Sequence, residues 1–302
     1  MKPFQIALSC RITSVLLLLM ASAAAAPSAS AAQVSDVLLA TVEQQASTLE
    51  ARIGFAAYDL ESGQRWEYQA EQRFPIASTF KTLACAALLH RVDAGRAQLD
   101  TAVNLTAEDL VTYSPVTEKY AGTRAMTLAQ LCEATLATSD NTAANLVLRA
   151  LGGPDAVTEF ARQLGDDITR LDRWETELNE ARPGDLRDTT TPSAMVANLE
   201  RLLLGDALSA ESRAQLRAWL EANQVAEGLF RGVVPADWVV ADRTGAGGFG
   251  SRAITAIMWP PNRQPLIAVI YITQTEAPIS ASNEAIAVIG AALVEALAQL
   301  PR

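Results

Sequence analysis

The sequence predicts an α+β fold, an α/β sandwich in which an antiparallel sheet is built from both chain ends and an all-helical lobe is inserted between them. Two observations lead to this prediction. Segments rich in β-branched and aromatic residues lie near the two ends of the mature chain, whereas the middle carries apolar residues at helical spacing. Strands separated by such an insertion can share one core if they join a single sheet that flanking helices cover.

The first residues are expected to be an export signal. Lys2 and Arg11 supply a basic start, an apolar stretch follows, and small residues at A-x-A-like spacing offer cleavage sites. We predict a signal peptide over residues 1–26, with cleavage between 25 and 32. The apolar stretch is too short to span a membrane. The mature protein is therefore expected in the periplasm, or outside the cell where the host lacks an outer membrane, without a membrane anchor.

The mature chain is expected to open with a β-hairpin and then a helix. Residues 52–60 and 65–69 are rich in strand formers and are separated by the turn sequence ESGQ. From Pro75 onward the apolar spacing becomes helical, and this helix is expected to stop before Gly95.

The middle of the chain is predicted to be helical up to a long loop. One helix should begin at Thr127, where Gln130 completes a capping box, and run to about residue 137. Two further helices are expected over residues 142–152 and 155–165, each ending at glycine. Residues 166–192 are polar and irregular, and a loop of this length in a compact domain is usually functional.

The last third returns to strands. Helical spacing covers residues 193–205 and 211–224, three strands are predicted over 238–245, 251–260 and 265–274, and an apolar-striped helix closes the chain at 282–300. We therefore divide the mature chain into an α/β lobe (33–74 and 209–302) and a helical lobe (75–208) that includes an active-site loop (171–188). A cleft between two such lobes is a frequent place for a binding site.

Composition excludes several classes of function. The net charge of −10 argues against nucleic acid or an anionic membrane surface as partner, because both require a basic patch. One histidine, His90, and two cysteines that remain after signal cleavage, Cys85 and Cys132, cannot build the usual zinc hydrolase site. In an exported chain these cysteines are expected to form a disulfide, with a reactive thiol as the alternative. We expect a monomer that acts on small molecules without a metal or cofactor.

Residues 245–250, GAGGFG, match the dinucleotide fingerprint G-x-G-x-x-G. That motif leads from a strand into a helix whose N-terminus meets the pyrophosphate. Here the glycines lead into another predicted strand. We therefore interpret them as the turn between two neighbouring strands, with room for a ligand close to the backbone.

Four short motifs carry residues suited to acyl transfer. Ser78 and Lys81 are three apart in a predicted helix, so the amine can reach the hydroxyl, and a desolvated lysine can act as a base. His90 lies about 18 Å further along that helix and cannot assist Ser78 from there. The other motifs are Ser139-Asp140-Asn141, the pair Glu175 and Asn179 in RWETELN, and DRTG at 242–245.

Together these motifs make the sequence resemble the class A serine β-lactamases, a family with S-x-x-K, S-D-N and K-T-G in that order. The segments VTYSPVTEKYAG, TSDNTAANLVL and LDRWETELNEARPGDLRDTTTP are also similar to that family, and the likeness spans the mature chain. It implies hydrolysis of the β-lactam amide through an acyl-serine intermediate, and thereby antibiotic resistance. The cysteine pair falls where some members carry a disulfide.

The resemblance assigns roles to individual residues. It implies that Ser78 is the nucleophile, that Lys81 or Glu175 is the acylation base, and that Glu175 with Asn179 holds the deacylating water. Ser139 would pass a proton to the ring nitrogen. The other implied sites are an oxyanion hole from Ser78 and Ala246, carboxylate contacts from Arg243, Thr244 and Arg252, a substrate amide contact from Asn141, an entrance wall at Tyr113, a close backbone approach at Gly245, and a loop-closing ion pair between Arg173 and Asp188.

The third motif departs from the family pattern, because Arg243 stands where most members have lysine. This is similar to the carbenicillin-hydrolysing branch, and a planar guanidinium could favour penicillins with a second carboxylate. Two alternative functions share the serine and lysine: a penicillin-binding DD-peptidase and a β-lactam sensor, neither of which turns penicillin over. Glu175 in its matching segment argues against the first, and the lack of an apparent membrane tether argues against the second.

Overall fold

The computed structural model describes Met1 and residues 29–300, so the predicted signal peptide lies outside the described residues apart from Met1. Its centre is a five-stranded antiparallel sheet in the order β2-β1-β9-β8-β7. The strands of this sheet are β1 (Arg52–Asp59), β2 (Arg65–Tyr68), β7 (Val239–Ala246), β8 (Arg252–Trp259) and β9 (Leu266–Thr273). Two pairs of short strands form separate two-stranded sheets: β3 (Phe74–Pro75) with β6 (Thr189–Thr190), and β4 (Ala102–Val103) with β5 (Met126–Thr127).

The sheet joins the two ends of the chain, as the sequence predicts. Arg52 at the start of β1 pairs with Thr273 at the end of β9, and the register continues to Asp59 opposite Leu266. Every residue of β9 is buried, because this central strand has a neighbour on each side and helices on both faces. The α+β class with a terminal-strand sheet is thereby confirmed.

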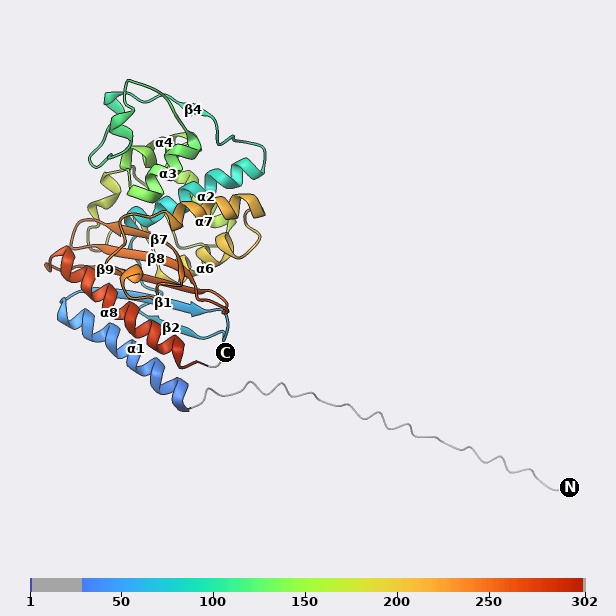
Figure 1. Cartoon of the computed structure of the whole chain (residues 1–302), viewed down its shortest axis with the longest axis vertical. Coiled ribbons are helices and arrows are strands. Elements are labelled where there is room, and N and C mark those ends of the chain that lie inside the picture. The colour runs from blue at the N-terminus through green and yellow to red at the C-terminus, as the bar shows by residue number, and fades with distance from the viewer. Residues whose placement is uncertain (2–28, 301–302) are drawn as a thin grey trace.

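Helices cover both faces of the sheet (Figure 1). They are α1 (Ala29–Thr48), α2 (Phe80–Asp93), α3 (Leu128–Thr138), α4 (Asn141–Leu151), α5 (Asp155–Gln163), α6 (Pro192–Leu203), α7 (Ala210–Glu221) and α8 (Ile279–Ala298). On one face α1 and α8 lie side by side, and on the other α6 contacts β1 and β9. The sheet therefore separates two hydrophobic cores, one beneath the terminal helices and one continuous with the helical region.

Helix α1 is absent from the sequence-based expectations, because its alanine-rich start overlaps the predicted cleavage region. Its Leu38 and Val42, four residues apart, are buried in the core beneath the terminal helices. The predicted boundary at residue 209 assigns α7 to the α/β lobe, yet α7 contacts both α2 of the helical region and β7 of the sheet. The two-lobe division remains a prediction.

Helix α8 is the one described helix that is long and apolar enough to cross a membrane by length and composition. Four residues of its predicted stripe, Ile286, Ile289, Leu293 and Leu297, are all buried. They pack on the sheet and on the segment around Phe230, with which α8 shares a core. Its apolar character is therefore explained by packing against the sheet.

Candidate active site

Ser78 lies on a tight turn ahead of α2. The sequence predicts a helix that begins at Pro75, but the structure has β3 there, followed by a 3-10 turn over Ala77–Thr79. Ala77 adopts a φ of +42°, which no helix allows. The turn is held from behind, since the Thr79 hydroxyl donates to Ile76 O at 2.5 Å and lies 2.9 Å from the hydroxyl of Tyr271 on β9. Ser78 is thus presented at the amino end of α2.

Strand β7 passes close to this turn because it carries a glycine. A Cβ at Gly245 would lie 3.1 Å from Ser78 N and 3.1 Å from the Ala77 methyl carbon, so a side chain there would push the strand away. Gly245 therefore allows the backbone of Ala246 and the N–H of Ser78 to border the same cavity. That is the arrangement required of two oxyanion donors.

Lys81 is fully buried next to Ser78, and the hydrogen-bonding and ionic partners of its ammonium group are all oxygen atoms. Its Nζ donates to Ser139 O at 2.9 Å, to Ser139 Oγ at 3.2 Å and to Asn141 Oδ1 at 2.6 Å, and it lies 3.0 Å from Glu175 Oε1. No hydrogen bond joins it to Ser78 Oγ in the described part of the chain. Burial lowers the pKa of Lys81 to about 8, while the charge of Glu175 acts in the opposite direction.

Glu175 connects the nucleophile to Lys81 and Asn179. Its Oε1 is 3.4 Å from Ser78 Oγ, and its Oε2 accepts from Asn179 Nδ2 at 2.5 Å. Asn145, a residue that sequence reasoning missed, fixes the backbone of Glu175 through hydrogen bonds of 2.8 and 2.9 Å to its carbonyl and N–H. Helical spacing could have identified Asn145, because it follows Asn141 by four residues on α4 and both side chains therefore face the same side of the helix.

The Ser139-Asp140-Asn141 motif forms the turn between α3 and α4. Ser139 has a φ of +66° and its hydroxyl donates to Ser78 Oγ at 3.3 Å. Asp140 is fully buried and caps α4 by accepting from Ala143 N at 2.8 Å, and it also accepts from Thr117 Oγ1 at 2.8 Å. These contacts make Asp140 structural, whereas Ser139 and Asn141 point into the site.

The loop that carries Glu175 is closed by charged pairs. Arg173 Nε lies 2.6 Å from Asp188 Oδ2, the ion pair expected from the sequence, and Arg173 Nη1 lies 2.7 Å from Glu180 Oε2. Asp188 is almost fully buried and also accepts from the N–H groups of Asp172 and Arg173. The two ends of the loop are thereby held together over the site.

Arg243 does not occupy the place that the sequence suggested. It is fully buried behind the pocket wall, where Nη1 donates to Leu136 O at 3.3 Å, and its Nε and Nη2 are buried without a hydrogen-bond partner among the described residues. Burial lowers its pKa to about 10, so it stays charged at neutral pH. Because the side chain is fully buried, its expected direct contact with a substrate carboxylate is not available in this conformation.

The remaining predicted residues border a pocket of about 360 Å³. Arg252 lies on its wall, held by Asn283 Oδ1 at 2.7 Å and by Gly245 O at 3.2 Å. The lining consists of Ser78, Tyr113, Ser139, Asn141, Asn179, Val225, Thr244, Gly245, Ala246, Arg252 and Ile279. The structure thus brings together nucleophile, polar anchors and a cation; Lys81, Glu175 and Arg243 lie directly behind this surface.

Cys85 and Cys132 form a disulfide between α2 and α3, which confirms the predicted pairing over a reactive thiol. His90 is near the far end of α2, where its ring packs against Phe160 at 5.4 Å. Within residues 29–300 no group of three or more His, Cys, Asp or Glu side chains is placed to hold a metal ion.

Comparison with known proteins identifies the family. Residues 31–297 match the model of the β-lactamase enzyme family. The chain belongs to this family. It is 51% identical to β-lactamase AER-1 of Aeromonas hydrophila over 86% of either protein, and 51% identical to β-lactamase CARB-3 of Pseudomonas aeruginosa over 82% of this chain and 88% of that one.

Solved β-lactamases have the same fold. An ancestral class A β-lactamase superposes with a TM-score of 0.83 at 51% identity, covering 87% of this chain and all of that one. The chromosome-encoded β-lactamase of Vibrio parahaemolyticus gives 0.84 at 45% identity, covering 85% and 98%. The predicted class A membership is confirmed, and this β-lactamase is a β-lactam hydrolase.

Proposed function

We propose that this β-lactamase hydrolyses penicillins through an acyl-enzyme on Ser78, with Glu175 as the base in both half-reactions. The observation that carries the proposal is the contact of one carboxylate, Glu175, with both the Ser78 hydroxyl and Asn179. A base must lie within reach of the proton it removes, directly or through one water.

In acylation, Ser78 Oγ attacks the lactam carbonyl carbon and gives its proton to Glu175. The carbonyl oxygen becomes anionic between the N–H groups of Ser78 and Ala246, a kind of stabilisation worth about 10²–10³ in rate. The carbon–nitrogen bond then breaks, and Ser139, 3.3 Å from Ser78 Oγ, passes its proton to the ring nitrogen. Ser139 regains a proton from the ammonium of Lys81, 3.2 Å away, which in turn takes the one that Glu175 received from Ser78, so Glu175 is free to act as a base again. Asn141 anchors the side-chain amide, and Tyr113 borders the entrance.

In deacylation, Glu175 and Asn179 hold a water molecule against the acyl carbon. Glu175 takes one proton from it, the hydroxide oxygen bonds to the carbon, and Ser78 Oγ leaves and recovers a proton. Lys81 serves as an ammonium ion throughout, because all four of its polar contacts are to oxygen acceptors. Its charge holds the Glu175 side chain in place, with Nζ 3.0 Å from Oε1.

For specificity we propose that Arg252 and Thr244 bind the ring carboxylate directly, and that Arg243 supplies positive potential from behind them. The second carboxylate of carbenicillin-type penicillins would benefit from the same potential. Charge at this depth is effective because little water screens it. We also propose that the protein is exported to the periplasm and acts there as a monomer.

The test is a Glu175→Gln variant mixed with benzylpenicillin and followed by mass spectrometry. We expect the acyl-enzyme to accumulate slowly and then to persist, because the variant retains Ser78 but lacks the base. Glu177→Gln is the matched control, since Glu177 lies on the same loop but is exposed. Free turnover by Glu175→Gln would rule out this carboxylate as the deacylation base. In the unmodified protein, a single stoichiometric burst with a chromogenic cephalosporin would contradict the proposal.

A further inference from the structure

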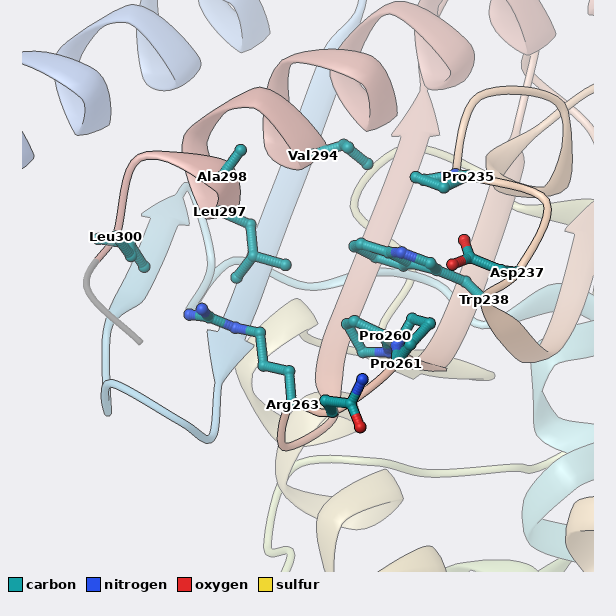
Figure 2. Close-up of a pocket in the computed structure, with 11 residues that line it drawn as sticks. Pro235, Asp237, Trp238, Pro260, Pro261, Arg263, Val294, Leu297, Ala298 and Leu300 are labelled. Atoms are coloured by element: carbon teal, nitrogen blue, oxygen red, sulfur yellow. The ribbon is translucent and has the colours of Figure 1, made fainter.

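Two apolar side chains on the wall of the pocket at Ser78, Val225 and Ile279, take no part in the reaction described above. Ile279 is the first residue of α8, and it is 56% exposed. The last turns of α8 border a different cavity, which Leu297 and Trp238 line with others (Figure 2). None of the residues that line that cavity borders the pocket at Ser78. The contribution of α8 to the active-site wall therefore comes from its amino end.

Ile279 lies beside Arg252. Asn283 follows Ile279 by four residues on α8, so the two side chains lie on the same face of the helix, one turn apart. Asn283 Oδ1 accepts a hydrogen bond from Arg252 Nε at 2.7 Å. Arg252 Nη1 also donates to Gly245 O at 3.2 Å, which fixes the guanidinium against β7. Ile279 is thus placed at the end of the pocket where this guanidinium lies.

Val225 approaches the same end of the pocket from the segment that follows α7. Asn223 Nδ2 donates to Asp242 Oδ1 at 2.8 Å, and Asn223 Oδ1 accepts from Val225 N at 3.1 Å. Asp242 and Thr244 are two residues apart on β7, so their side chains point to the same face of the strand. Val225, two residues after Asn223, therefore lies by Thr244, and both border the pocket.

A carboxylate held by Arg252 and Thr244 brings one part of a penicillin to these two apolar side chains. This step rests on the proposed function, in which Arg252 and Thr244 bind the ring carboxylate. In a penicillin the carbon that bears the carboxylate is bonded to a carbon with two methyl groups. Anchoring the carboxylate therefore also places the methyl groups next to the guanidinium. Apolar side chains favour methyl groups there, because the contact removes apolar surface from water.

We propose that Ile279 is a specificity-determining residue, which together with Val225 contacts the two methyl groups beside the ring carboxylate of a penicillin. The contact lies away from the carbonyl that Ser78 attacks, and it exists before and during the attack. It therefore stabilises bound substrate and transition state alike, which lowers KM and leaves kcat almost unchanged. Because Ile279 is partly open to solvent, the gain should be smaller than that of an enclosed apolar pocket.

The test compares benzylpenicillin with its bisnor analogue, which has hydrogen atoms in place of the two methyl groups and is otherwise identical. For benzylpenicillin, Ile279→Ala should lower kcat/KM by about three- to tenfold through a rise in KM, with kcat changed by less than about twofold. For the bisnor analogue, kcat/KM should change by less than about twofold. Ile279→Val keeps a branched apolar side chain and should retain at least about half of the wild-type kcat/KM for benzylpenicillin.

Val288→Ala is the matched control, because Val288 is also exposed on α8 but lies outside the pocket lining, and it should change neither substrate's kinetics. An equal loss of kcat/KM for both compounds with Ile279→Ala, or no loss for benzylpenicillin, would overturn the assigned contact. Arg252→Ala separates that result from a failure of the proposed function, since it should lower kcat/KM for both compounds by similar factors. If Arg252→Ala affected neither compound, the placement of the carboxylate would be wrong, and the contact at Ile279 would be refuted with it.

Discussion

Lys81 Nζ lies 3.0 Å from Glu175 Oε1, and neither side chain is exposed to solvent. A cation and a carboxylate buried together each depend on the other, because an unpaired buried charge is expensive. The pair also determines how activity responds to pH, since burial lowers the pKa of Lys81 to about 8. Below that value Lys81 carries a proton and pairs with the Glu175 side chain.

We predict that kcat/KM for benzylpenicillin falls as the pH rises through about 8. The rate should fall because the protonated form of Lys81 is the active one. Since its pKa is lowered, the ammonium is lost well below the pH at which a free lysine would lose it. Steady-state rates at buffered points on both sides of that pH provide the measurement. A rate that instead rises through the same range would identify neutral Lys81 as the acylation base.

Arg243→Lys tests the electrostatic role of the third motif. Lysine lacks the guanidinium fork that reaches Leu136 O, so the charge should move and the field at the pocket should change. We expect kcat/KM for carbenicillin to fall roughly three- to tenfold more than that for ampicillin, because only carbenicillin has the second carboxylate. An unchanged ratio of the two specificity constants would remove the link between Arg243 and carbenicillin.

Much of the fold follows from local pattern, while the fine geometry of the site does not. The hairpin, the Thr127–Gln130 capping box and the stripe on α8 depend on residues within one or two turns, which a sequence displays directly. The turn at Ser78 depends on Tyr271, 192 residues from its partner Thr79, and no local signal announces that contact. The depth of Arg243 likewise depends on the neighbouring helix end at Leu136 rather than on its own motif.

Removing the disulfide should lower stability without removing activity. Cys85 and Cys132 are fully buried and join α2 to α3 across 47 residues of sequence. A cross-link of that span restricts the unfolded chain, so the Cys85→Ala/Cys132→Ala double variant should lose about 2–4 kcal/mol of unfolding free energy. Urea denaturation measures this, with reduced wild-type protein as the matched sample. Equal midpoints for the oxidised protein and the double variant would show that the cross-link contributes nothing to stability. Penicillin turnover by the double variant near 25 °C should stay within about twofold of the wild-type rate.

Gly248 lies where the β7–β8 turn rests on the loop that carries Glu175. Its N–H donates to Asn179 O at 2.8 Å, and a Cβ at this position would lie 2.4 Å from Glu180 O. Gly248→Ala should therefore push the loop outward and shift Asn179, which holds Glu175 Oε2. Misplacing a reacting group by about 1 Å can cost about 10²-fold in rate, and we expect kcat to fall by at least tenfold.

The defect should be larger in deacylation than in acylation, because only deacylation requires the water that Glu175 and Asn179 hold together. Acyl-enzyme should therefore accumulate during turnover of benzylpenicillin, and KM should fall together with kcat. Gly228→Ala is the matched control, since a Cβ there meets nothing within 4 Å. If Gly248→Ala kept the wild-type kcat and showed no accumulated acyl-enzyme, the glycine-rich turn would have no part in positioning the loop.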